Sequence, residues 1–350
     1  MKGRVVALDR LGAREAAALI VGGRLEDLLV APPAGAPPGP GAILRGRMGR
    51  PVKGLGGAFV DLPDGRTGFL KETAGLAPGR PVLVQVTGWL EPGKAVPLTA
   101  RLLLRSRYAI ATPGAPGLNL SRGIRDEAAR ARLAALAEAG MAGSAAGLIL
   151  RTAAAAAPEA DIAADIAAVR ALAEAVAGDL SGAPELLVDA PGPHLAAWRD
   201  WAEPAPDEVD DRPGAFARHG VHEAVAALRT GTAPLPGGGR MTVEATRALV
   251  AVDVDTGTDT SPAAGLKANL AAVRDLPRQL RLRGLGGQVV IDMAPLARKD
   301  RPQVEGQLRA AVRAGAPEIT LAGWTPLGNY ELTRRRDRLP LAGLPEEPPP

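Results

Sequence analysis

The spacing of apolar residues changes along the chain, and the changes predict where strands give way to helices. Short apolar runs separated by Gly, Pro and Asp occur at the spacing of a small β-barrel, with expected strands at residues 42–47, 57–62, 67–70 and 82–86. Residues 125–187 instead carry Leu, Ile and Val at helical intervals, and one apolar run at 147–151 is typical of a strand. We therefore expect a mixed α/β unit after the barrel.

Two segments lack a regular pattern. Residues 31–40 are dense in proline and glycine, which indicates a linker after a short first unit. Residues 198–214 contain Pro204, Pro206 and Pro213 together with many acids. We expect this second segment to separate the α/β unit from the rest of the chain.

The last block of the chain predicts a strand, a helix and a second strand. A glycine turn at residues 237–239 precedes a run at 241–243, and residues 247–255 have the composition of a buried strand. Gly284 should end the following helix, and residues 288–292 predict the second buried strand. The two strands should be parallel because a helix connects them.

The helix between these strands has a polar start and one apolar face. Ser261 and Pro262 suit its N-cap and its first helical position. Pro277 should kink or interrupt the helix, because proline has no N–H to donate. The residues of the apolar face are Leu266, Leu270, Val273 and Leu280.

Acidic residues mark the carboxyl ends of the two strands, where α/β sheets bind ligands. Asp253 and Asp255 are two residues apart and point to one face, and Asp292 ends the second strand. These carboxylates would repel one another unless a cation neutralises them, and oxygen ligands suit Mg²⁺ or Mn²⁺. Such an ion can orient a water and stabilise charge on a phosphodiester. The alternative is that the three side chains cap strand ends and bind loop amides.

Composition limits the classes of protein that fit. With 350 residues, 46% of them hydrophobic, the chain can bury the cores of two or three domains. It has no cysteine, which excludes disulfides and thiolate metal sites and fits a reducing cytoplasm. No apolar run reaches the roughly 18 to 20 residues of a membrane span, and charged residues interrupt the first segment where a signal peptide would be apolar. We expect a cytoplasmic protein without membrane contact.

Charge and histidine content add two further expectations. The net charge is +4, and its clustering favours a polyanionic partner. The clustered basic residues are Arg274, Arg278, Arg281, Arg283, Arg298, Lys299, Arg301, Arg334, Arg335, Arg336 and Arg338. His219 and His222 are spaced to share one helix face, where a surface pair is expected and a zinc site is the alternative.

Residues 244–293 closely resemble the catalytic core of the bacterial RNase E/G family of endoribonucleases; their sequence is EATRALVAVDVDTGTDTSPAAGLKANLAAVRDLPRQLRLRGLGGQVVIDM. Weaker similarity covers most of the remaining chain, including GGRLEDL, GAFVDL, GFL and GLILRT. The resemblance implies an Mg²⁺-dependent endoribonuclease that hydrolyses single-stranded RNA in ribosomal RNA processing or messenger RNA decay.

The resemblance also implies site residues. In the family two Asp residues hold a single Mg²⁺, and the matching positions are Asp253 and Asp292. An Asn usually lies between them and orients the site, whereas this chain has Asp255 there. Asp255 either orients its neighbours by hydrogen bonds or joins the metal shell. We expect all three acids to be catalytic, with Asp253 and Asp292 as the metal ligands.

Two groups of residues are expected to contact RNA. Phe59 and Phe69 match aromatic positions on which bases stack in the family, although residues alone would favour a role in the barrel core. Arg274, Arg278 and Arg281 follow i, i+4, i+7 and would contact the RNA backbone or form a solvated face.

A pocket for a 5′-monophosphate is implied at Arg122, Arg151 and Thr152, where guanidinium groups and a hydroxyl suit a terminal phosphate. The residues that follow Thr152 are all alanine, unlike the glycine and polar residues common in the family. Without the resemblance, Arg151 would be a solvated strand end. The expectation is faster cleavage of RNA that carries a 5′-monophosphate.

The fold class implied is α/β, of α+β multidomain type, with RNase H-like and DNase I-like units and an inserted OB-fold β-barrel. The expected domains are 1–36 (first part of the RNase H-like unit), 37–104 (OB barrel), 105–187 (5′-phosphate sensor-like unit), 188–230 (shortened second part of the RNase H-like unit), 231–342 (DNase I-like catalytic unit) and 343–350 (disordered tail).

Because the chain stops soon after Arg338, we expect the family's cysteine-bearing zinc link and small domain to be missing. We expect no zinc and no zinc-linked tetramer, and a homodimer stays open. Two other functions also stay open. One is a noncatalytic RNA-binding relative that kept the fold, and the other is a DNA nuclease, because carboxylate-bound Mg²⁺ does not itself select the sugar.

Overall fold

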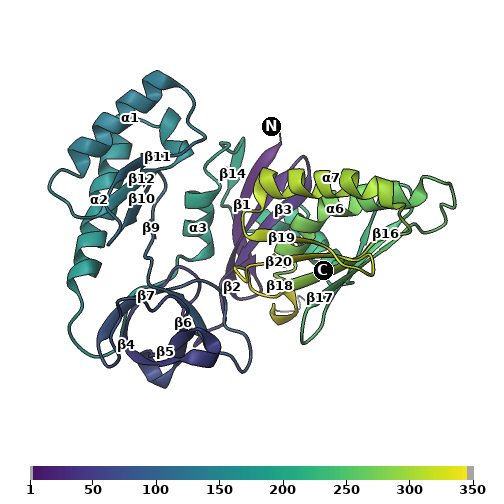
Figure 1. The fold of residues 1–350 in the computed structure, drawn as a ribbon. Helices are drawn as coiled ribbons and strands as arrows, with labels where there is room; N and C mark the ends of the chain where they lie inside the picture. The colour runs from purple at the N-terminus through teal and green to yellow at the C-terminus, as the bar shows by residue number, and fades with distance from the viewer. Residues whose placement is uncertain (1–2, 345–350) are drawn as a thin grey trace. The chain divides into compact units, whose positions relative to one another are not determined.

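The chain folds into two units, each built from two separate stretches of sequence, in the computed structural model of residues 3–344 (Figure 1). Unit 1 contains the described residues up to Val6 together with Ala31–Val209. Unit 2 contains Ala7–Val30 and the described residues from Asp210 onward. Both units are mixtures of helices and strands, as expected from the α/β class.

The chain passes between the units at three points, and all three lie within or directly after strands of one four-stranded sheet. Two passages lie within β1 (Arg4–Leu11) and β14 (Glu208–Asp210), and the third follows the end of β3 (Arg24–Val30). The strand order is β14-β1-β2-β3, in which β2 spans Arg14–Val21. The apolar run in β2 is buried, so it is a core strand.

Unit 1 contains the small barrel that the sequence predicts. Val60, Leu70 and Val84 are fully buried in its interior, and β7 pairs back to β4 to close it. A five-stranded barrel fits the architecture of OB folds. In order around the barrel, the strands are β4 (Ile43–Val52), β5 (Gly57–Asp61), β6 (Thr67–Leu70), β8 (Val96–Thr99) and β7 (Pro81–Val86).

The strand β8 was absent from the expected elements. Its sequence contains Pro97, and proline inside a short run argues against a strand because it cannot donate to the ladder. In the structure β8 nevertheless pairs with β6 in parallel and with β7 in antiparallel, so tertiary pairing overrides the local signal.

A second sheet of unit 1 packs against two helices, as the helical pattern of residues 125–187 predicts. Asp126 caps the first helix by accepting a hydrogen bond from the Ala129 amide at 2.7 Å. Leu133, Leu148 and Ile162 are fully buried where helices and sheet meet. The helices are α1 (Glu127–Gly140) and α2 (Glu159–Gly178), and the sheet order is β11 (Leu118–Leu120), β12 (Gly147–Leu150), β10 (Ala109–Thr112), β9 (Leu104–Arg105).

The remaining elements of unit 1 are short. The strand β13 (Glu185–Val188) pairs with β4 beside the barrel, and α3 (Pro193–Asp200) follows it.

Short 3₁₀ helices occur in both units, at Lys53–Leu55, Pro63–Gly65, Thr152–Ala156, Arg298–Asp300 and Leu341–Gly343.

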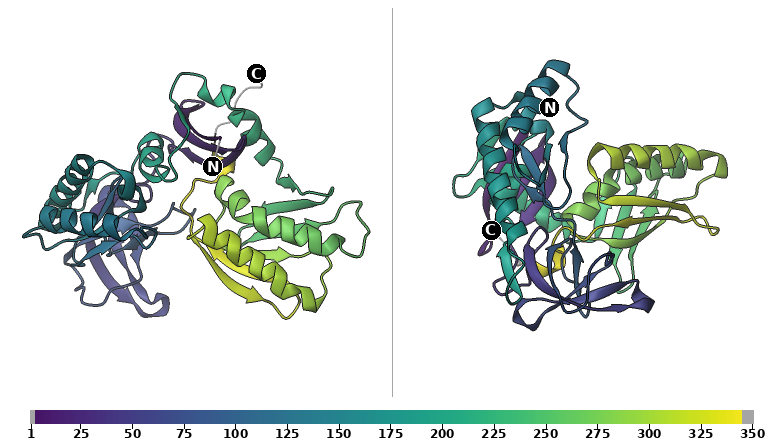
Figure 2. Two further views of the ribbon diagram at one scale, coloured as in Figure 1. Left: turned by 90° about the horizontal axis from the view of Figure 1, so that it is seen from above. Right: turned by 60° about the vertical axis from the view of Figure 1, so that its left-hand side comes forward.

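Unit 2 is built on a six-stranded sheet. Two long helices, α6 (Ala264–Leu282) and α7 (Arg301–Gly315), lie side by side and cover one face of this sheet (Figure 2). Two shorter helices, α4 (Ala215–Arg218) and α5 (Val221–Leu228), precede the sheet in the chain. The strands, in sheet order, are β15 (Thr232–Pro234), β16 (Arg240–Ala245), β17 (Val250–Asp255), β18 (Gly287–Asp292), β20 (Tyr330–Arg334) and β19 (Ile319–Trp324).

The helix α6 departs from two expectations. It begins at Ala264 rather than at Pro262, and no side chain caps its first turn, so the predicted Ser261 N-cap is wrong. It also runs through Pro277 without interruption. Pro277 is buried within an apolar face that packs on the sheet, and this packing outweighs the lost backbone hydrogen bond. The predicted stop is confirmed, because Gly284 follows the helix at φ +63°.

A buried ion-pair network joins β3 to α6 and to the last part of unit 2. Asp27 is 7% exposed and accepts from Arg338 at 2.9 Å and from the Leu28 amide at 2.9 Å. Burial alone would raise the pKa of Asp27, but Arg338 and Arg281 hold that pKa below its ordinary value. The network therefore keeps a carboxylate charged inside the unit.

Two expectations concern the ends of the chain and membranes. The expected tail at 343–350 lies outside the described residues from position 345 onward, while Gly343 ends a 3₁₀ turn and Leu344 is buried. Among the helices that the structure describes, none combines the length and the apolar character needed to cross a bilayer.

Replacing Asp27 with Asn should destabilise the chain by on the order of 3 to 5 kcal/mol, because Arg338 and Arg281 would lose a buried partner. The pKa of Asp27 is lower in the folded chain than in the unfolded chain, so its contribution is present above about pH 5 and is lost as pH falls. Urea unfolding of both proteins at pH 7 and at acidic pH measures this difference. The exposed pair partner Asp64 provides a control, since Asp64→Asn should leave the midpoint nearly unchanged. A pH-independent difference would contradict the assignment.

Candidate active site

Parallel pairing of β17 and β18 brings Asp253 and Asp292 side by side. The two residues are direct partners in the register, on neighbouring strands that lie about 4.8 Å apart. Both are exposed, whereas Val252 and Ile291, one position earlier on each strand, are buried under the helices. The two carboxylates therefore share the uncovered face of the sheet, and the predicted strand, helix, strand arrangement is confirmed.

Asp255 lies on the same face but has other partners. Its Oδ2 accepts from the Arg240 guanidinium at 2.6 Å, and its Oδ1 accepts from the Gly257 amide at 2.5 Å. These two interactions, the amide first, lower the pKa of Asp255. In the region that the structure describes, the carboxylate oxygens of Asp253, Asp255 and Asp292 do not all lie within 4.8 Å of one another. The expected convergence of three acids is thus a pair with a third acid beside it.

The pair Asp253 and Asp292 suits a hard divalent cation. Mg²⁺ is commonly bound through one or two carboxylates, with waters and phosphate oxygens completing its shell. Two exposed carboxylates on neighbouring strands supply the protein ligands for such an ion and leave the solvent side open. The donor set therefore fits the cation implied by the sequence.

Asn269 supports the site and was not among the expected residues. It is fully buried in α6, and its amide exchanges two hydrogen bonds with the backbone of Ala294. Asn269 Nδ2 donates to the Ala294 carbonyl at 2.9 Å, and the Ala294 amide donates to Oδ1 at 3.0 Å. These bonds fix the chain two residues after Asp292. The available signal was an amide placed among the apolar positions of the predicted helix.

Phe59 and Phe69 lie on the surface of the barrel. They are cross-strand partners on β5 and β6, with ring centroids 5.4 Å apart in an edge-to-face arrangement. Phe59 is 39% exposed, and neither ring belongs to the barrel core, so the alternative of two core residues is wrong. Gly57 leaves room for the second ring, since an added Cβ would lie 2.7 Å from Phe69 Cζ.

A groove beside Phe59 combines an aromatic ring with two cationic side chains. Arg66 and Lys94 provide the positive charge, and Leu90 is an exposed apolar residue at its edge. The lining residues are Phe59, Arg66, Thr67, Leu90, Lys94, Ala95 and Val96. Rings and cations together are the features of surfaces that bind single-stranded nucleic acid.

Of the residues expected to bind a 5′-phosphate, Thr152 lies beside the turn that carries Arg122, whereas the side chain of Arg151 is already engaged in contacts within unit 1. Thr152 Oγ1 lies 2.8 Å from Ser121 Oγ, next to the turn that carries the exposed Arg122. Arg151 is only 22% exposed and donates to two backbone carbonyls and to Asp200 Oδ1 at 3.0 Å. Arg151 is therefore not the solvated strand end that the residues alone suggested.

The three arginines expected on one face of α6 separate into two groups. Arg278 donates to the Leu25 carbonyl at 2.7 Å, and Arg281 donates to the Glu26 carbonyl at 2.8 Å. Both side chains are about 15% exposed and hold β3 against the helix. Arg274 is exposed and makes a long contact to Gln307. The expectation of one solvent-facing basic row is therefore corrected to one exposed arginine and two that are engaged within the fold.

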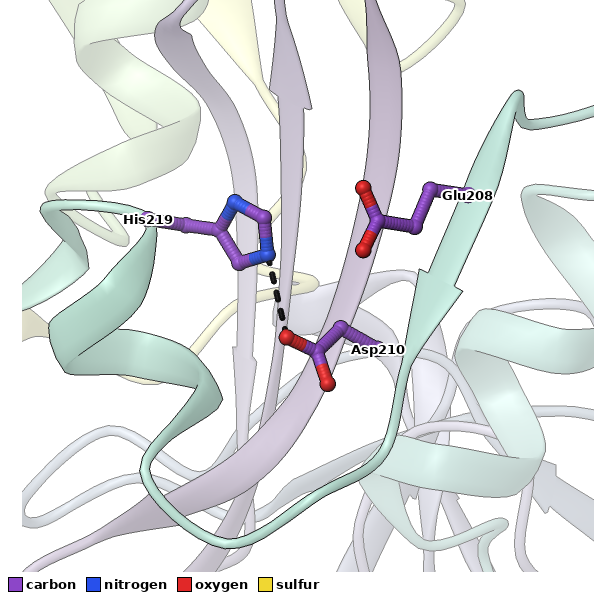
Figure 3. Close-up of side chains that lie close together, drawn as sticks. All are labelled: Glu208, Asp210 and His219. Carbon is purple, nitrogen blue, oxygen red and sulfur yellow. Dashed lines mark hydrogen bonds and ion pairs between the residues drawn. The ribbon is translucent and has the colours of Figure 1, made fainter.

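A second polar cluster surrounds Asp210, which is fully buried as a side chain. His219 Nε2 lies 3.2 Å from Asp210 Oδ2, and Figure 3 shows this contact together with Glu208 of the same strand. Arg212 and Arg218 also donate to Asp210 and hold its pKa far below the ordinary value. The carboxylate is therefore neutralised by arginines, and Glu208, Asp210 and His219 each place one possible metal-ligand atom within 4.8 Å of the others.

The histidine pair does not share one helix. His219 follows the end of α4, whereas His222 lies in α5 with its ring 5.9 Å from that of Phe216. Both are half-buried, so the expectation of a surface pair is corrected.

The comparisons with known proteins place the chain in a family. The family model described as "Ribonuclease E/G family" matches residues 103–212 and 207–337, which is more than half of the chain. The chain belongs to the Ribonuclease E/G family. It is 31% identical to a protein named Ribonuclease E from Nostoc sp., over 85% of this chain and 51% of that protein. It therefore spans about half the length of that relative.

Other relatives within the family are similar over comparable spans. A protein named Ribonuclease G from Salmonella typhimurium is 27% identical over 85% of this chain and 73% of its own length. A protein named Ribonuclease E from Synechocystis sp. is 29% identical over 89% of this chain and 54% of its own length. Both regions matched by the family model include residues singled out above: Arg151 and Thr152 in the first, Asp253 and Asp292 in the second.

Replacing Asn269 with Ala should lower the free energy of unfolding by about 1 to 3 kcal/mol, because the buried Ala294 amide and carbonyl lose their partners. Urea unfolding measures this loss, and hydrogen exchange should show faster exchange of the Ala294 amide. Asn119 is exposed on β11 and serves as the control, since Asn119→Ala should change neither quantity. Slow exchange of Ala294 in the Asn269 variant would show that other contacts hold this loop.

Proposed function

We propose that this protein is an Mg²⁺-dependent endoribonuclease that hydrolyses single-stranded RNA, in ribosomal RNA processing or messenger RNA decay. The observation that carries the proposal is the register pair Asp253 and Asp292 on the uncovered face of the unit 2 sheet. Membership of the Ribonuclease E/G family and the names of the relatives support it. Mn²⁺ is the alternative cation, since it accepts the same oxygen ligands.

Asp253 and Asp292 bind the cation through their carboxylates in this mechanism. A cation held there would supply an oriented water and positive charge beside the phosphodiester. Asn269 keeps the chain after Asp292 in place through the Ala294 backbone, so that the second carboxylate stays opposite the first. Asp255 acts from beside the pair and orients its neighbours through the Gly257 turn and Arg240.

The barrel binds the RNA strand in this proposal. Phe59 and Phe69 supply faces on which bases stack, and Arg66 and Lys94 attract the phosphates from the groove. Of the three arginines on α6, Arg274 is the one exposed to contact the backbone, while Arg278 and Arg281 support it by holding the helix against β3.

The domain organisation extends this proposal. We assign an OB-type RNA-binding barrel to residues 37–104, a 5′-phosphate sensor-like unit to 105–187 and a DNase I-like catalytic unit to 231–342. The RNase H-like unit would combine residues 1–36 and 188–230. Each assignment follows the resemblance of the chain to the family.

Cleavage of a labelled single-stranded RNA by the purified protein with Mg²⁺ tests the proposal. We expect cleavage that stops on chelation, and a loss of at least about 100-fold in Asp292→Asn, because one of two metal ligands is removed. Asp211→Asn changes an exposed acid of the same unit and should cleave normally.

Three other results would contradict the proposal. RNA binding without any cleavage would identify a noncatalytic RNA-binding relative. Equal cleavage of DNA of the same sequence would identify a nuclease that does not select the sugar. Unchanged cleavage by Asp292→Asn would remove the metal pair from the mechanism.

We also propose a preference for 5′-monophosphorylated RNA. Thr152, Ser121 and the exposed Arg122 offer hydroxyls and a cation to a terminal phosphate, and Arg151 directly precedes Thr152 with its guanidinium paired to Asp200.

Matched substrates that differ only at the 5′ end test this preference. The 5′-monophosphate form should be cut about tenfold faster than the 5′-triphosphate form, the factor expected from about 1.4 kcal/mol of differential binding. Thr152→Val should reduce the difference without changing cleavage of the triphosphate form, because only the hydroxyl is lost. Equal rates in the wild-type protein would remove the sensor.

A further inference from the structure

The uncovered face of the unit 2 sheet carries one more carboxylate than a single divalent cation neutralises. Asp253 and Asp292 together carry two negative charges, which one Mg²⁺ balances. Asp255 lies two residues after Asp253 on the same face and adds a third. An unpaired third charge would attract the cation and would repel the phosphates of an RNA strand.

Arg240 is placed to cancel this extra charge. It is the direct register partner of Asp255 on the neighbouring strand β16, and its guanidinium meets Asp255 Oδ2 at 2.6 Å. The Gly257 amide occupies the other oxygen of Asp255 at 2.5 Å. Both oxygens are thereby directed to the strand and the turn, and not to the pair formed by Asp253 and Asp292.

Fold stability gives little reason for this ion pair. The Arg240 side chain is 59% exposed and that of Asp255 is 34% exposed, and ion pairs at such positions contribute little to stability. The position of the pair, one strand from Asp253 and facing the same side, gives a functional reason instead.

We propose that Arg240 is a positioning residue that sets the charge of the active site. It neutralises Asp255 and holds that carboxylate away from the cation, so that Asp253 and Asp292 alone bind the ion. This inference rests on the proposed metal-dependent nuclease. It also accounts for an Asp at the position where the resemblance expects an Asn, because the Arg240 and Asp255 pair is neutral overall.

A double-mutant cycle with two readouts tests the inference. Arg240→Ala should lower kcat/KM for RNA by about tenfold and tighten Mn²⁺ binding by at least about fivefold, because Asp255 becomes an unpaired charge next to the pair. Adding Asp255→Asn to Arg240→Ala should bring both values back to within about twofold of Asp255→Asn alone, since the charge is then absent. Mn²⁺ binding is measured by paramagnetic resonance without RNA.

Two further variants separate charge from folding. Arg240→Lys keeps the positive charge and should retain most activity and ordinary Mn²⁺ affinity. Arg309→Ala removes the arginine of another exposed ion pair in unit 2 and should change neither readout. Unfolding midpoints should be the same for all variants.

The outcomes distinguish this inference from its alternatives. If the loss in Arg240→Ala persists when Asp255 is Asn, Arg240 acts directly on RNA and the inference is overturned. Mn²⁺ affinity that is the same in all variants would also overturn it. If the wild-type protein cleaves no RNA, the proposed function fails, and the Mn²⁺ measurement alone still decides whether Arg240 controls the charge at Asp255.

Discussion

The candidate site depends on one constraint, which is that two parallel strands place two carboxylates opposite each other in the register. The backbones of Asp253 and Asp292 cannot move apart without breaking the pairing of β17 and β18, whose buried residues belong to the core of unit 2. Like charges held so close are unfavourable unless a cation joins them. The sheet topology therefore creates the carboxylate pair on which the proposed cation site rests.

Buried polar side chains hold the elements of unit 2 together, both beside Asp292 and at the opposite end of the sheet. Asn269 fixes the loop after Asp292, and Arg278 and Arg281 hold β3 on the outer side of the same helix. Arg334 is likewise buried and paired with acids within unit 2. Several basic residues in the last quarter of the chain thus stabilise unit 2. The exposed basic residues, such as Arg274, Arg298 and Lys299, are the ones that can attract a polyanion.

The sequence predicted the central geometry because its signals are local. Apolar runs predicted the strands β17 and β18, and Gly284 predicted the end of α6. The order strand, helix, strand then implied that the two strands are parallel. The partners of Asp255 and Arg278 could not be predicted, since Arg240 and β3 meet them only through strand pairing and helix packing. The strand β8 was missed because Pro97 opposes it locally, and the continuous α6 was missed because Pro277 is tolerated only in its packed environment.

A crystal structure of the protein soaked with Mn²⁺ tests the central claim most directly, because the anomalous signal locates the ion without reference to activity. The account predicts one Mn²⁺ bound between the carboxylates of Asp253 and Asp292, with the Arg240 and Asp255 ion pair intact beside it. Carboxylates of Asp253 and Asp292 that point apart, with no ion between them at saturating Mn²⁺, would contradict the account.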